Sequence, residues 1–74
     1  MASYNGHRNW NYWNVSLWIN NDEGLYNLAR RCARTSNNRT EAAEKFLDCM
    51  DGIAATPDGA EYTIPSVRAA MKYM

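Results

Sequence analysis

The sequence predicts an all-α fold, a compact single domain of about four short helices over residues 1–74, in which residues 1–8 are a polar N-terminal arm. In four segments the apolar residues recur with the 3.6-residue period of a helix and do not alternate as in a strand. Clusters of turn-forming residues separate these segments. A chain of 74 residues buries only about 60% of its unfolded surface, so we expect one small core.

The first expected helix covers residues 10–20. Trp10, Trp13 and Leu17 are spaced so that they share one helix face. Asn9 is the expected N-cap, because an asparagine side chain can accept a hydrogen bond from the free amides of the first turn. Tryptophan and valine also favour strands, but the lack of alternation favours a helix.

The second expected helix lies within residues 20–34, with Asn21 as its N-cap. Asp22 and Glu23 bring negative charge to its first turn, and arginines follow at its other end, where the helix dipole favours cations. These arginines are Arg30, Arg31 and Arg34. The apolar stripe consists of Leu25, Leu28, Ala29 and Cys32. Residues 35–38 form a turn cluster that ends the helix.

The third expected helix begins with Thr40 as its N-cap and carries acidic residues in its early turns. One face repeats apolar residues at helical spacing. This face consists of Ala43, Phe46, Leu47, Met50, Ile53 and Ala54. Pro57 and Gly59 then break the chain, because proline presets a turn angle and glycine accepts a positive φ.

The fourth expected helix has Pro65 near its start. Its apolar positions are Ile64, Val67, Met71 and Met74. The four periodic segments together predict a core. The expected core residues are Trp13, Leu17, Leu25, Leu28, Phe46, Leu47, Met50, Ile53, Val67 and Met71.

Tryptophan and asparagine are concentrated in residues 9–24 (NWNYWNVSLWINNDEG). Because large apolar side chains are scarce in so short a chain, we expect the other three helices to wrap the first helix, with its tryptophans in the core. The asparagines would bond to nearby backbone or cap helix ends. The alternative is a partly exposed tryptophan that anchors a binding partner.

The charge of the chain is balanced overall but unevenly distributed. Residues 1–39 carry five basic and two acidic side chains, a net charge of +3, and residues 40–74 carry three basic and six acidic ones, a net charge of −3. A net charge of zero provides no general attraction to nucleic acid or to an anionic membrane. Opposite charges on the two halves suit packing between them or a partner with both signs.

We expect a reducing cytoplasmic compartment, because the first residues lack the apolar run of a secretory signal. No stretch approaches the length of a membrane span. Cys32 and Cys49 are then reduced, buried and structural, each acting as a small hydrophobic residue.

The sequence offers little support for catalysis, and we expect neither enzymatic activity nor a cofactor. His7 is the single histidine and lies in the polar arm without a partner for acid–base chemistry. One histidine and two cysteines are too few for a closed zinc site. Glu44, Asp48 and Asp51 form an acidic helix stripe, which we interpret as an exposed face because three carboxylates on one helix cannot surround a cation.

The arginines of the second helix, with Arg39, are the one candidate for nucleic-acid contact. They could bind phosphates while Tyr26 or a tryptophan stacks on a base. The neutral chain and the acids that follow argue against this interpretation. The same arginines also complement the dipole of the helix, which needs no ligand.

Residues 4–28 resemble a family of small uncharacterised proteins carried by phages, plasmids and similar mobile elements. The resemblance covers about a third of the chain. Its matching parts are Tyr4-Asn5-Gly6, Asn9, Trp13-Asn14-Val15, Leu17-Trp18 and Asn21-Asp22-Glu23-Gly24-Leu25-Tyr26. Residues 10–12 depart from the family pattern, in which an aromatic, an acid and a threonine are common. The family has no established activity, so no functional residue is carried over.

The resemblance implies a small protein that binds a host protein, and an anti-CRISPR or other anti-defence inhibitor is the most concrete member of that class. The expected contacts are charged residues that the predicted core does not explain. They are Arg30, Arg31, Arg34, Glu44, Asp48 and Asp51. The alternative is a nucleic-acid-binding accessory protein that uses the arginine cluster. The sequence does not determine an oligomeric state.

Overall fold

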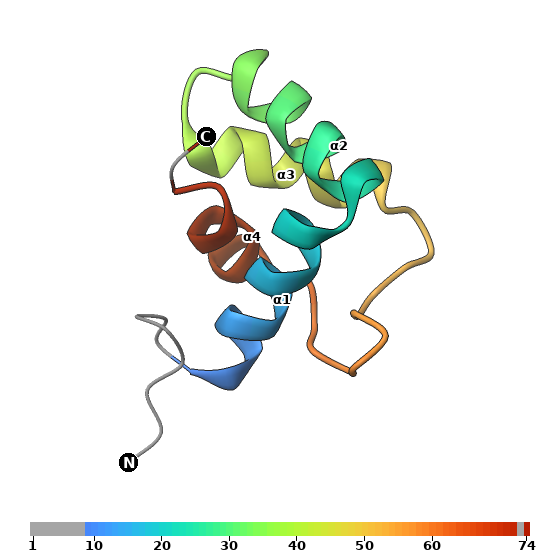
Figure 1. Cartoon of the computed structure of the whole chain (residues 1–74). Helices are drawn as coiled ribbons and strands as arrows, with labels where there is room; N and C mark the ends of the chain where they lie inside the picture. The colour runs from blue at the N-terminus through green and yellow to red at the C-terminus, as the bar shows by residue number, and fades with distance from the viewer. Residues whose placement is uncertain (1–8, 73) are drawn as a thin grey trace.

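The computed structural model describes residues 9–72 and 74, which form four α-helices (Figure 1). The helices are α1 (Trp10–Asn21), α2 (Glu23–Arg34), α3 (Arg39–Cys49) and α4 (Ile64–Ala70). Apart from one isolated bridge between Ala55 and Glu61, the described residues form no β-structure. The all-α prediction is confirmed.

The helices pack as a ring in which each helix contacts two others. α1 packs against α2 and α4, and α3 packs against the same two helices (Figure 1). Within the described residues α1 and α3 do not pack on each other, so the expectation that three helices wrap the first one is wrong. Part of the remaining side of α1 is covered by the loop between α3 and α4, which bonds to it through Asp58 and Glu61.

A single residue, Asp22, separates α1 from α2. Its side chain accepts a hydrogen bond from the amide of Leu25 at 3.0 Å and caps α2. The prediction of Asn21 as this cap is wrong, because Asn21 is still helical in α1 and Asp22 is the first residue with extended backbone. Asn9 caps α1 as predicted, since its side chain accepts from the amide of Tyr12 at 3.1 Å.

The N-cap of α3 is Asn38, whose side chain accepts a hydrogen bond from the amide of Glu41 at 2.8 Å. The prediction of Thr40 as the cap is wrong, because Thr40 already lies in the first helical turn. Asparagine is among the best N-cap residues. The helix therefore begins at Arg39, as soon as the extended backbone of the cap ends.

The apolar face predicted for residues 43–54 is interrupted, because α3 ends at Cys49. A tight turn follows, in which Gly52 has a φ of 83° and the amide of Ile53 donates to the carbonyl of Met50 at 2.8 Å. Glycine adopts this left-handed backbone without steric cost. Ile53 and Ala54 consequently leave the core, and Ile53 is 54% exposed.

A capping box opens α4. The amide of Ser66 donates to the side chain of Thr63 at 3.2 Å, and the amide of Thr63 donates to the hydroxyl of Ser66 at 2.9 Å. The pair satisfies two amides that a helix start leaves free. Pro65 lies in the first turn, as predicted, where its missing N–H costs nothing.

Phe46 is the largest fully buried side chain of the core. Its ring lies tilted against that of Tyr62, with the centroids 6.1 Å apart. Four of the predicted core residues are buried, namely Phe46, Met50, Val67 and Met71. Three more are half-buried and pack against the core, namely Leu25, Leu28 and Leu47. Leu17 is 38% exposed, so its predicted place in the core is wrong, as is that of Ile53.

The tryptophans of α1 do not fill the core, which corrects the prediction from their spacing. Trp10 is 40% exposed, and Trp13 and Trp18 are half-buried. The fully buried apolar residues of α1 are Val15 and Ile19, one helical turn apart. The apolar side chains that α1 buries completely are thus smaller than its indoles, which remain partly exposed.

Candidate interaction surface

α2 and α3 form an antiparallel pair in which charge is separated along the length. The short turn of residues 35–38 joins them, and the two helices lie against each other (Figure 1). The end of the pair near this turn carries Arg30, Arg31, Arg34 and Arg39, together with the ion pair of Glu41 and Lys45. The other end carries Asp22, Glu23, Asp48 and Asp51. We call these the basic end and the acidic end of the α2–α3 pair.

The basic end contains a hollow of about 390 Å³. It is lined by Asn27, Arg30, Arg31, Arg34 and Thr35. The arginines are exposed, and none has a carboxylate within ion-pair distance among residues 9–72 and 74. The structure thus brings the three predicted arginines together in one concave surface whose lining side chains offer hydrogen-bond donors and no carboxylate.

Tyr26 supports one edge of this surface. The guanidinium carbon of Arg30 lies 5.8 Å from the centroid of the Tyr26 ring, within the range of a cation–π contact. A second hollow of about 240 Å³ lies beside it, lined by Tyr26, Arg30, Arg34 and Met74. Arg30 and Arg34 therefore form the wall between two adjacent depressions.

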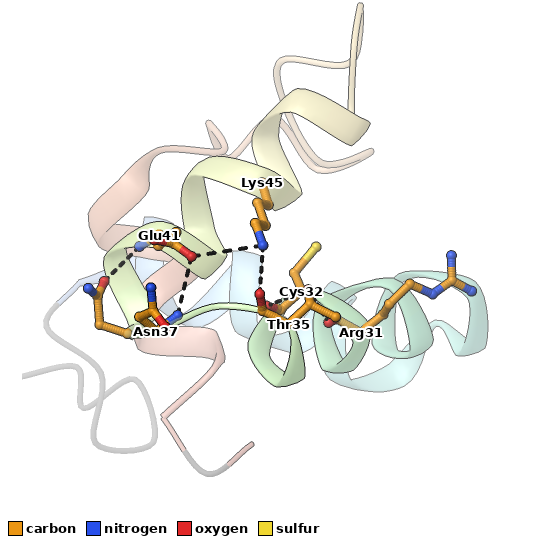
Figure 2. A network of polar contacts seen from close by, with 7 residues as sticks. Arg31, Cys32, Thr35, Asn37, Glu41 and Lys45 are labelled. Atoms are coloured by element: carbon orange, nitrogen blue, oxygen red, sulfur yellow. Dashed lines mark hydrogen bonds and ion pairs between the residues drawn. The ribbon is translucent and has the colours of Figure 1, made fainter.

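A polar network fixes the turn between α2 and α3 (Figure 2). The ammonium of Lys45 donates to the carbonyl of Thr35 at 2.7 Å and lies 3.8 Å from the carboxylate of Glu41. That carboxylate accepts from the amide of Asn37 at 3.2 Å, and the hydroxyl of Thr35 donates to the carbonyl of Arg31 at 2.9 Å. Figure 2 shows the guanidinium of Arg31 pointing away from this network. Carbonyls at the end of α2 are thus satisfied without the arginines.

The predicted acidic residues do not form a single helix stripe. Glu44 and Asp48 are exposed and one turn apart on α3, but Asp51 lies beyond the end of that helix. The helix ends early because of the turn at Gly52. All three remain exposed, and in the described part of the chain none is paired with an arginine.

The loop between α3 and α4 is held to α1 by contacts that the sequence did not predict. Asp58 Oδ2 accepts from the Nδ2 of Asn14 and the Nε1 of Trp18, each at 2.9 Å. These two donors lower the pKa of the Asp58 carboxyl. The hydroxyl of Thr56 donates to the Oδ1 of buried Asn14 at 2.6 Å. Asn14 and Trp18 of the opening segment thus hold this loop in place. In the sequence, the only sign of the loop was the turn-forming stretch of residues 57–59.

The two cysteines lie in different surroundings, although both are free thiols. Cys32 is buried, and burial raises the pKa of its thiol, with the neighbouring Cys49 raising it further. Cys49 is exposed, so the prediction that both are buried is wrong for Cys49. It is the last residue of α3, where the helix leaves the core.

The described residues contain no cluster of metal-ligating side chains. His7 lies outside the residues that the structure describes. In residues 9–72 and 74, no three histidine, cysteine, aspartate or glutamate side chains are placed to hold a metal ion. Of the four helices described, none has both the length and the apolar character to cross a bilayer.

The sequence model of one protein family matches residues 1–74, and its description is "Family of unknown function (DUF7249)". Neither the comparison with curated proteins nor the comparison with solved structures found a match.

Proposed function

We propose that this chain, which belongs to the DUF7249 family of unknown function, is a small non-enzymatic protein that binds a host protein and inhibits it. The resemblance of residues 4–28 to proteins of phages and plasmids supports an origin in a mobile element. A CRISPR–Cas effector or another defence complex in the host cytoplasm is the most concrete target.

One observation carries this proposal: the α2–α3 pair exposes opposite charges at its two ends, and they are not neutralised within the described structure. Arg30, Arg31 and Arg34 would contact an acidic area of the partner. Asp48 and Asp51 at the acidic end, with Glu44 one helical turn before Asp48, would contact a basic one. Complementary charge of this kind speeds encounter and selects the partner.

The same arrangement favours a protein over a nucleic acid as the partner. α2 has 12 residues and is about 18 Å long. A duplex carries one negative charge per roughly 1.7 Å of its axis. A duplex lying along the α2–α3 pair would therefore place phosphates against the acidic end as well as the basic one. A protein surface can match both signs.

The proposal is tested by capturing partners from a host lysate on the full chain, with and without nuclease, and identifying them by mass spectrometry. The captured protein is then purified, and its own activity is measured with and without the chain. We expect retention to survive nuclease, inhibition to follow binding, and both to be lost in Arg31→Glu. Arg68→Glu is the matched control, because Arg68 is an exposed arginine on α4, which does not pack against α2.

Recovery of nucleic acid alone, with an affinity that falls steeply with salt, would overturn the proposal in favour of an accessory protein that binds nucleic acid through the arginines. A partner that is bound but keeps its full activity would overturn the inhibitory part.

A further inference from the structure

Four residues of α2 that line the basic hollow form one continuous patch on the helix surface. Asn27 precedes Arg30 and Arg31 by three and four residues, and Arg34 follows them at four and three. Residues at these spacings are surface neighbours. Three guanidinium groups and one carboxamide are therefore gathered in a patch of about two helical turns.

Nothing in the described structure neutralises this patch. Like charges one turn apart destabilise a helix, and no carboxylate pairs with the three arginines in residues 9–72 and 74. The helix dipole favours cations only in the last turn, which includes Arg31 and Arg34 but not Arg30. Thr35 and Lys45 already bond to carbonyls at the end of α2. The guanidinium donors thus remain for a ligand.

We propose that this hollow binds the side-chain carboxylates of an acidic segment of the partner protein, an inference that rests on the proposed function. A guanidinium presents two parallel N–H groups that match the two oxygens of a carboxylate. Adjacent arginines on one helix then hold several carboxylates at once. Hydrogen bonds involving charged groups are about twice as strong as neutral ones.

Two features favour carboxylates over a phosphodiester chain. The basic patch is short, and the same helix pair ends in Asp22, Glu23 and Asp48, which would repel a longer polyanion. The ring of Tyr26 is already engaged by the guanidinium of Arg30, so it offers less open surface for stacking on a base.

The test titrates the full chain with hexaglutamate and, separately, with single-stranded oligothymidylate of equal charge, using isothermal titration calorimetry at constant ionic strength. The variant is Arg31→Gln with Arg34→Gln, and the control is Arg68→Gln. We expect the chain to prefer hexaglutamate. The double variant should bind hexaglutamate at least about tenfold more weakly, as expected from the loss of charged hydrogen bonds. The control should stay within about twofold.

Three outcomes would overturn this inference. One is equal hexaglutamate binding by the double variant, and another is tighter binding of the oligothymidylate. A third is concentration-dependent self-association that the same substitutions abolish, which would assign the hollow to the acidic end of a second copy. These readouts do not depend on a host lysate. If hexaglutamate binds as expected but no host protein is retained, the proposed function fails and the site stands.

Discussion

The indole N–H of Trp18 donates to the carboxylate of Asp58 at 2.9 Å, across 40 positions of the chain. The same oxygen accepts from the side-chain Nδ2 of Asn14, one helical turn earlier on α1. This contact fastens the loop between α3 and α4 to the first helix. It also accounts for one tryptophan and one asparagine of the opening segment, because both side chains donate to the loop.

Replacing Asp58 with asparagine should change how stability depends on pH. The hydrogen bonds from Asn14 and Trp18 hold the pKa of this carboxyl below its ordinary value. A carboxyl with a lowered folded-state pKa stabilises the protein above its unfolded-state pKa, and this contribution disappears as the pH falls through the folded-state value. Wild type should therefore be more stable than Asp58→Asn near neutral pH, and the difference should shrink below about pH 4.

Urea unfolding of both proteins from neutral to acidic pH, followed by tryptophan fluorescence, measures this difference. A difference that stays constant over the whole range would show that the charge of Asp58 does not take part in holding the loop.

Replacing Phe46 with alanine should destabilise the fold by about 3–5 kcal/mol, because Phe46 is fully buried and packs against Tyr62. Small domains have only about 5–15 kcal/mol of total stability, so the melting temperature should fall sharply. Ile53→Ala is the matched control, because Ile53 is 54% exposed and should change stability by less than about 0.5 kcal/mol. Thermal melts by circular dichroism compare the two, and equal melting temperatures would place Phe46 outside the core.

The position of the α3 cap can be tested by comparing two alanine substitutions. Asn38→Ala removes the side chain that accepts from the amide of Glu41 and should cost about 0.5–2 kcal/mol. Thr40→Ala lies within the first turn and should have little effect, because alanine is the best helix former. Urea midpoints measure both, and a larger loss for Thr40→Ala would restore the cap predicted from the sequence.

The two cysteines should react at different rates with a chromogenic thiol reagent. Cys49 is exposed and should be labelled first, whereas Cys32 is buried and has a raised pKa, so little thiolate is available. Cys49→Ser should remove the fast phase and leave the slow one. A single slow phase in wild type would mean that Cys49 is protected after all.

The helices themselves could be predicted because their signals are local. The periodicity of α2, the turn residues at positions 35–38 and the proline at the start of α4 each act within a few residues. The candidate arginines were also visible, since their spacing on α2 places them together without any help from the rest of the fold. The cap of α1 was predicted correctly as Asn9. The caps of α2 and α3 were missed by one or two residues, because several neighbouring side chains could each have served as a cap.

Which face of α1 is buried was decided by tertiary structure. On α1 the spacing alone made Trp10, Trp13 and Leu17 an apolar face, yet the buried pair is Val15 and Ile19. That choice depends on where α2, α4 and the loop carrying Asp58 come to lie, and both α4 and this loop are distant from α1 in sequence. Periodicity predicts that a helix has an apolar side. Whether a given side chain is buried depends on which helices and loops pack against it.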